Sequence, residues 1–403
     1  MKRFFLLIIL IFSFGSLWSN NIVNEYIAII KEINKIVPSI WGIKFYPNII
    51  FIDIQQNKMY IINDVINNNN YTVRKWDNKI LPANSCLSYG DKKYITIIYD
   101  SYSRLNFLDK IALIAHESYH YYQEEIGYKM VSSNNTYLDN GEGRILLRCE
   151  LKALEKALKN DTNALKDALL IRVYRQSLFN TNNETEFELN EGLAEYTKLA
   201  CICNSMEDLK EKLLLSIINN DSIGYTNNFA YMTGPIYAYF LNNNDFAKKH
   251  LNDITDELKR SYKIPIFFDK TKIFPILTKY GYHEIAEQEK NKTISICKYY
   301  LKNKDYIYIR NNNTNFSFNP NDRIIEINDS LLLLSNTKLK SEWGIIEASN
   351  GLIRDKNWKF FLLPPPKSII GNRVIGECYR IELTDSYNLI KVNNIWKILK
   401  SKD

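Results

Sequence analysis

The feature that most constrains this chain is the pentapeptide His116–His120, which has the sequence His-Glu-Ser-Tyr-His. It follows the apolar run Ile111–Ala115, and the polar residues Asn106 and Asp109 supply a helix start. Histidines four residues apart lie on one face of a helix. Their imidazole nitrogens can therefore share one Zn²⁺, and Glu117 between them can take a proton from a metal-bound water.

The alternative is a pair of helical histidines that hydrogen-bond to neighbouring carbonyl groups. The chain has only four histidines, so this spacing around a glutamate favours a metal site. The other two, His250 and His283, have no partner at a ligand spacing, and we expect them at the surface or in packing contacts.

A second acidic motif, Asn190–Tyr196, contains two glutamates four residues apart, which share a helix face. A catalytic zinc site needs a third protein ligand and an open position for water, and we assign Glu191 as that ligand. Glu195 is then placed to accept the second ring N–H of a ligand histidine. The reverse assignment remains open, as does an ordinary exposed helix with two acids. Gly192 lowers helix stability, so we expect another backbone or the metal to approach it closely.

The two motifs together resemble those of the gluzincin metallopeptidases, the thermolysin-like superfamily. There, H-E-x-x-H is followed at a distance by a ligand glutamate on a later helix. The resemblance covers Lys93 to about Phe240 and implies a helical zincin-like domain with one Zn²⁺. It implies these site residues: His116, His120 and Glu191 as ligands, Glu117 as general base, and Glu195 in the orienting position that other members fill with aspartate.

Tyr231 and Gly234 are similar to a Y-x-x-G motif that follows the ligand helix in aminopeptidase-like gluzincins. A tyrosine O–H near the metal can donate to the oxyanion of a tetrahedral intermediate. Tyr237 is a second candidate for this role. Because the chain contains 28 tyrosines, a packing role is the alternative for each of them.

The N-terminus has the pattern of a signal peptide. Lys2 and Arg3 precede an apolar stretch, Phe4–Phe14, and Gly15–Ser19 is a plausible cleavage zone. We therefore expect residues 1–19 to be removed and the protein to be exported, periplasmic or extracellular, without a stable membrane span. An uncleaved N-terminal anchor is the alternative.

The charge and the cysteine content of the chain limit the binding partners and covalent links that we expect. The net charge of +7 is spread along the chain without a dense basic block, which argues against a nucleic-acid partner. The six cysteines permit disulfides after export, but the sequence does not select a pairing, and buried free thiols remain an alternative.

The predicted fold class is α+β, with a mainly helical zincin-like catalytic domain over residues 20–290. Strands are predicted at Ile49–Ile54, Lys58–Asn63 and Lys93–Tyr99, with a turn at Asn67–Asn70. Pro38 is expected to end the first helix. The predicted helices are Asn21–Val37, Asn106–Ile126, Arg144–Lys159, Ala164–Phe179, one from Thr185 or Glu186 with a Thr185–Glu188 capping box, Tyr231–Leu241, and most of Asp245–Gln288. Arg148 and Glu150 are expected on a solvated or salt-bridged face.

Residues 291–403 are predicted to form a separate all-β module, a sandwich or barrel. This part contains no histidine, so it adds no metal ligand of that type. Its predicted strands are Thr293–Tyr300, Tyr306–Ile309, Arg323–Ile327, Leu331–Leu334, Gly344–Glu347, Trp358–Leu363, Val374–Ile381 and Leu389–Leu399.

The sequence therefore predicts an exported zinc peptidase that acts on a peptide or protein substrate. Two alternatives remain. One is a non-catalytic exported binding protein with a structural metal site, although such sites are normally closed by four protein ligands. The other is a metal-dependent hydrolase of a non-peptide bond.

Overall fold

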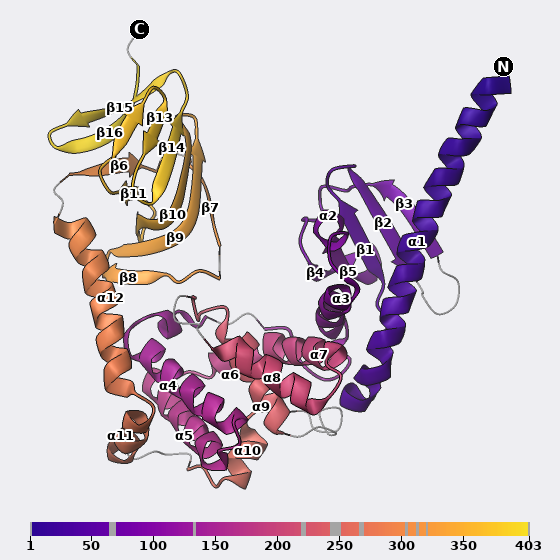
Figure 1. Ribbon diagram of the computed structural model, residues 1–403, viewed down its shortest axis with the longest axis horizontal. Coiled ribbons are helices and arrows are strands. Elements are labelled where there is room, and N and C mark those ends of the chain that lie inside the picture. The colour runs from indigo at the N-terminus through magenta and orange to yellow at the C-terminus, as the bar shows by residue number, and fades with distance from the viewer. Residues whose placement is uncertain are drawn as a thin grey trace. The chain divides into compact units, whose positions relative to one another are not determined.

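The computed structural model describes residues 2–63, 70–131, 134–218, 223–241, 251–265, 270–302, 305–311, 314–319 and 321–401 (Figure 1). It has the predicted α+β composition, with a small N-terminal sheet, many helices and a C-terminal β module. The chain forms two compact units. Unit 1 contains Met1–Ser133, Asn182–Ser216 and Ala230–Ser261, and unit 2 contains Asn134–Thr181, Ile217–Phe229 and Tyr262–Asp403. The predicted domain limits after residues 19 and 290 stay predictions.

The sheet of unit 1 has the strand order β3-β2-β1-β5-β4. Its strands are β1 (Ile49–Asp53), β2 (Lys58–Asn63), β3 (Asn70–Lys75), β4 (Ser85–Tyr89) and β5 (Lys92–Ile98). The predicted hairpin of β1 and β2 is confirmed, and β5 lies parallel to β1. Strands β3 and β4 were not predicted. The turn predicted at Asn67–Asn70 lies mostly outside the described residues, which omit 67–69. Its last residue, Asn70, begins β3.

Helix α1 (Lys2–Trp41) runs alongside this sheet (Figure 1). Its second half carries the predicted apolar stripe, in which Tyr26, Ile29 and Ile33 are fully buried. The expectation that Pro38 ends the helix was wrong, because Pro38 lies within its last turn. The predicted signal peptide lies in the first half of α1, and its cleavage stays a prediction. Within the described part of the chain, none of the helices combines the length and apolar character that a membrane crossing requires.

Helices α3 and α7 pack against each other in unit 1, and α1 packs on both. The Trp41 indole N–H donates to the Thr197 hydroxyl at 3.0 Å, which ties α1 to α7. The helical elements of this unit, some shared with unit 2 at their ends, are α2 (Tyr99–Tyr102), α3 (Phe107–Tyr122), α6 (Asn183–Phe187), a π-helical turn η2 (Glu188–Gly192), α7 (Leu193–Ile202), α8 (Met206–Ile217), α9 (Phe229–Phe240) and α10 (Asp256–Ser261).

The predicted capping box at Thr185 and Glu188 was wrong. Helix α6 begins two residues earlier, with Asn182 at the N-cap position. The Glu188 carboxylate is fully buried and accepts a hydrogen bond from the Thr233 hydroxyl instead. A long-range contact therefore replaces the local one that the spacing suggested.

Unit 2 combines a group of helices with the β module. Helices α4 (Gly141–Leu158) and α5 (Thr162–Phe179) confirm two predictions and pack together. The unit also contains the 3₁₀ turn η1 (Thr136–Asp139), α11 (Lys270–Lys279) and α12 (Tyr282–Lys302). The predicted strand at Thr293–Tyr300 was wrong, because this segment continues α12. A helix that already buries Ile285 and Glu289 on one face overrides the strand preference of its β-branched residues.

The β module contains eleven strands in one curled sheet (Figure 1). Its core is formed by fully buried residues such as Leu339, Ile346 and Phe361. Most predicted strand positions are confirmed, with different limits. The strands are β6 (Tyr306–Arg310), β7 (Asn315–Phe318), β8 (Ile325–Asn328), β9 (Leu331–Ser341), β10 (Gly344–Asp355), β11 (Phe360–Leu363), β12 (Ser368–Ile370), β13 (Arg373–Ile375), β14 (Tyr379–Leu383), β15 (Tyr387–Val392) and β16 (Ile395–Lys400).

Candidate metal centre

Helix α3 holds the two histidines on a well-anchored scaffold. Its N-cap residue, Asn106, accepts a hydrogen bond from the backbone N–H of Asp109 at 2.9 Å. The apolar side of the helix is buried, with Ile114, Ala115 and Tyr119 inaccessible to solvent. Because this face is fixed in the core, the orientation of His116 and His120 is fixed as well.

Three ligand atoms converge at this helix. The Nε2 atoms of His116 and His120 are 3.3 Å apart. The Oε2 atom of Glu191 lies 3.5 Å from the first nitrogen and 3.6 Å from the second. This group of two histidines and one glutamate could hold a metal ion.

Glu191 comes from the π-helical turn η2, not from a regular α-helix. Such single wide turns inside helices occur frequently at functional sites. The Tyr119 hydroxyl of α3 donates to the backbone carbonyl of Leu189 at 2.7 Å and so ties the turn to the histidine helix. The Asn190 side chain donates to Glu191 Oε1 at 3.0 Å, which leaves Oε2 turned toward the histidines.

The structure brings Gly192 into contact with a second backbone, as its position predicted. A Cβ atom on Gly192 would lie 2.8 Å from the Cα atom of Gly234 in α9 and 2.9 Å from the carbonyl oxygen of Ala230. Only glycine permits this approach, because both neighbours are backbone atoms that cannot move aside. The crossing sets α9 directly against the turn that carries Glu191.

Glu195, predicted to orient a ligand histidine, lies next to the Nδ1 atom of His116. Its Oε2 atom is 3.7 Å from His116 Nδ1, on the opposite side of the ring from the other ligand atoms. Lys198 Nζ lies 2.9 Å and 3.0 Å from the two oxygens of Glu195 and holds the carboxylate in place. Glu191, not Glu195, therefore belongs to the group of ligand atoms.

Gln123 is a site residue that sequence reasoning missed. It is fully buried, and its Oε1 atom lies 3.1 Å from His120 Nδ1. Its Nε2 donates to the backbone carbonyl of Lys129 at 2.9 Å. A carbonyl can only accept, so the amide orientation is fixed and His120 Nδ1 must carry the proton. His120 Nε2 is then the free ligand atom. A polar residue three positions after a helical histidine was the available signal.

Glu117 is 7% exposed and lies beside the histidines. Burial raises the pKa of Glu117 above its ordinary value, and the charges of His116 and His120 only partly oppose this. For Glu191 the balance is reversed. Burial would raise its pKa, but the neighbouring imidazoles of His116 and His120 and the hydroxyl of Tyr231 outweigh burial and hold the pKa well below the ordinary value. The two carboxyl groups thus differ in proton affinity. This difference suits a proton acceptor at Glu117 and an ionised ligand at Glu191.

Tyr231 also lies in the site. Its hydroxyl donates to Glu191 Oε2 at 2.6 Å, and its ring stacks on the His116 ring with centroids 6.0 Å apart. Burial, with the Glu191 charge, raises the pKa of Tyr231, so the phenol stays protonated. Tyr237 is fully buried elsewhere along α9. His283 is exposed on α12 of unit 2, and His250 lies outside the described residues.

Within the described part of the structure, no cysteine joins this group of ligand atoms. Cys86, Cys149, Cys201, Cys203 and Cys378 form no disulfide among the described residues. Burial raises the pKa of Cys201 to about 12, so this thiol is a poor ligand or nucleophile. The side chain of Cys297 lies outside the described part of the structure.

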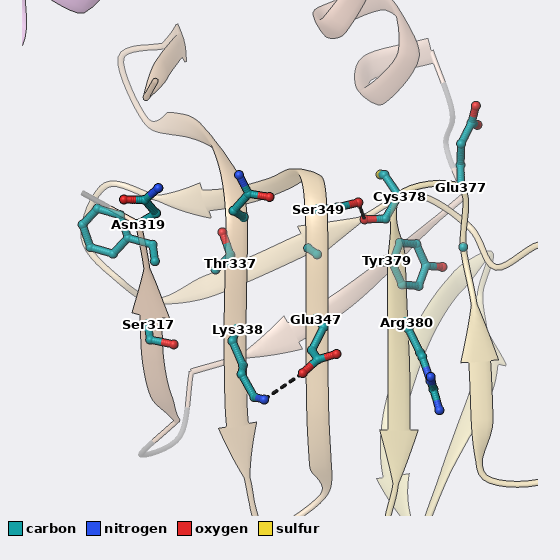
Figure 2. Close-up of a pocket in the computed structure, with 14 residues that line it drawn as sticks. Ser317, Asn319, Thr337, Lys338, Glu347, Ser349, Glu377, Cys378, Tyr379 and Arg380 are labelled. Atoms are coloured by element: carbon teal, nitrogen blue, oxygen red, sulfur yellow. Dashed lines mark hydrogen bonds and ion pairs between the residues drawn. The ribbon is translucent and has the colours of Figure 1, made fainter. Parts of the chain in front are cut away.

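The β module has a hollow of about 790 Å³ on its sheet. Figure 2 shows Ser317, Lys338, Glu347 and Arg380 in a row across β7, β9, β10 and β14. Lys338 and Glu347 form an ion pair of 2.7 Å, and Arg380 is paired with Glu382, so these basic side chains are already matched by acids.

No protein-family model matches this chain, and comparisons with curated proteins and with solved structures find no match either. The resemblance to gluzincins therefore rests on the motif residues themselves.

Proposed function

We propose that this protein is an exported zinc peptidase with one Zn²⁺ per chain. The observation that carries the proposal is the spacing of the three ligand atoms, 3.3, 3.5 and 3.6 Å. Three ligands of a tetrahedral Zn²⁺ with bonds of 2.0–2.1 Å would be about 3.3–3.4 Å apart. The donor set fits this ion, since two imidazoles and one carboxylate leave the fourth position open. When bound, Zn²⁺ would lower the pKa of a water molecule and polarise a carbonyl group.

The surrounding residues would then act in sequence. Glu117, with its raised proton affinity, accepts a proton from the attacking water and passes it to the leaving amine. The Tyr231 hydroxyl is a donor at the same point and is suited to stabilise the oxyanion of the substrate. Glu195 and Gln123 hold the two imidazoles in the orientation that ligation needs.

The assignment to a peptide or protein substrate rests on the gluzincin-like motifs, and export rests on the N-terminal sequence pattern. The mild, dispersed positive charge supports a substrate other than nucleic acid.

The test is elemental analysis of purified protein, followed by hydrolysis of a mixed peptide library by wild type and Glu117→Gln. About one zinc per chain with cleavage by wild type alone would support the proposal. Zinc without cleavage by either protein would move the assignment to a non-peptide substrate or a binding role. Absence of zinc would overturn it.

A further inference from the structure

Unit 2 contains a cavity of about 860 Å³ that is separate from the metal centre. It lies between the start of α4, helix α12 and strand β8. Apolar side chains form much of its wall, including Ile145, Phe179 and Ile325. Its volume is in the range of small-molecule sites in proteins.

Three arginines surround one carboxylate at this cavity. Glu289 lines it, and its Oε1 atom accepts from Arg144 Nε at 3.2 Å and from Arg148 Nη1 at 2.7 Å. Its Oε2 atom lies 2.7 Å from Arg323 Nη2. Arg148, expected on a solvated or salt-bridged face, is ion-paired but only 7% exposed. Asp139 is the other acid in the cluster, 3.4 Å from Arg144 Nη1. Three cations and two anions leave one excess positive charge.

Arg323 is the member of the cluster with unused hydrogen-bonding capacity. It lines the cavity and is 5% exposed. Its Nε and Nη1 atoms are buried and have no acceptor within the described part of the structure. Burial and the nearby Arg144 charge lower the pKa of Arg323. An anion beside this guanidinium would supply the missing acceptor and offset the repulsion.

The start of α4 adds a second source of donors. Asn140 occupies the N-cap position without a side-chain cap, because its Oδ1 accepts from the backbone N–H of Glu326 at 3.0 Å instead. The backbone N–H groups of Gly141, Glu142 and Gly143 find no acceptor among the described residues. Asn140, Gly141 and Glu142 all line the cavity. Unpaired N–H groups at a helix N-terminus favour an anion.

We propose that this cavity binds a carboxylate carried on an apolar body, such as a peptide C-terminus with an apolar last residue or a free carboxylic acid. A single negative charge matches the excess charge of the arginine cluster. The wall also contains the Glu142 and Glu326 carboxylates, held by Tyr282 and Lys356. These acids disfavour a doubly charged phosphate. The proposal does not depend on the metal centre, since none of its residues belongs to unit 1.

The experiment is calorimetric titration of the full chain, with a chelator present so that a carboxylate cannot bind a metal ion instead. The probes are N-acetyl-phenylalanine, its amide, 3-phenylpropionate and phenyl phosphate. The variants are Arg323→Gln, which removes the unpaired donors, and Ala286→Phe, which fills the cavity and keeps every charge. Arg354→Gln is the matched control, because Arg354 also has a buried Nε that lacks a hydrogen-bond partner among the described residues, but Arg354 does not line the cavity.

We expect at least one acid to bind wild type and Arg354→Gln equally, and to bind Arg323→Gln and Ala286→Phe roughly tenfold more weakly or worse. The affinity of wild type for the amide should be no higher than the affinity of Arg323→Gln for the acid. Tighter binding of N-acetyl-phenylalanine indicates a peptide end, and tighter binding of 3-phenylpropionate a free acid. The proposal fails if neither acid binds wild type, if the amide or phenyl phosphate binds as well as the acids, or if a folded Ala286→Phe binds like wild type.

Discussion

A Cβ atom built on Gly234 would lie 2.6 Å from the Cα atom of Gly192, so the helices that carry these glycines cross with their backbones in contact. The crossing places Tyr231, three residues before Gly234, against Glu191, the residue before Gly192. Two positions without side chains therefore decide which tyrosine reaches the candidate ligand group.

Alanine at either glycine should separate the two backbones. We expect Gly192→Ala and Gly234→Ala each to lower the free energy of unfolding by about 1–3 kcal/mol, the usual cost of overpacking, and to weaken metal binding. Chemical denaturation and metal titration would check this. Gly90→Ala is the control, since a Cβ there meets none of the described residues within 4 Å and only its φ of +60° is strained. Metal affinity at the wild-type level in both helix variants would show that the crossing does not position the site.

Removal of Glu117, the proposed general base, should lower turnover without loss of the bound metal. Glu117→Gln keeps the size of the side chain and loses the proton acceptor, so we expect the bound metal to remain and the rate of peptide hydrolysis to fall roughly 10²–10⁴-fold. Metal analysis and hydrolysis rates on the same preparation measure both effects. Retained activity would remove Glu117 from the mechanism.

The two acids of the second motif should differ in their effect on the metal. Glu191→Ala removes one of three ligand atoms, and we expect its metal content to be close to zero. Glu195→Ala removes only a contact to His116 Nδ1, so its affinity should fall about 10–100-fold. Competition with a chromophoric chelator ranks the variants. The reverse order would make Glu195 the ligand.

Gln123 should matter for metal affinity although it cannot reach the metal. In Gln123→Leu, His120 loses the acceptor that fixes its tautomer, and we expect an affinity about 10–100-fold weaker. The tautomer itself can be followed by ¹⁵N chemical shifts of the His120 ring in the metal-free protein. Gln56→Leu, at an exposed position, is the control. An unchanged Nδ1–H population in Gln123→Leu would contradict the role we assign to the amide.

Glu289 should make the free energy of unfolding decrease as the pH falls into the acid range. Burial raises its pKa, but the charges of Arg144, Arg323 and Arg148 outweigh burial, and the net pKa is lowered. A carboxyl group with a lowered folded-state pKa stabilises the fold above its unfolded pKa of about 4.3, and this stability is lost as the pH falls through the folded-state pKa.

We therefore expect Glu289→Gln to cost about 3–5 kcal/mol at pH 7 and progressively less as the pH falls below 4. Denaturation of wild type and variant across this pH range measures the difference. Glu347→Gln is the control, because the partner of Glu347 is an exposed lysine and solvent screens the pair. A cost for Glu289→Gln that does not vary with pH would refute the assignment.

Periodic patterns predicted the long elements well. Helices α4 and α5 and the β1–β2 hairpin follow from the spacing of their apolar residues, because each buries one continuous face. Errors arose where a contact from elsewhere in the chain decided the outcome. Residues 293–300 continue a helix already packed on its earlier turns, and Glu188 bonds to Thr233 instead of capping its own helix.

The sequence by itself determined the histidine pair, the glutamate between them and the acidic pair further along, because side chains four residues apart lie on one face of a helix with about 3.6 residues per turn. It also indicated that Gly192 needs a close neighbour. Only the tertiary structure decided that Gly234 is this neighbour, that Glu191 and not Glu195 joins the histidines, and that Gln123 fixes the His120 tautomer. These outcomes depend on how separate segments pack against one another. The spacing of residues along one helix carries no information about the distances between segments.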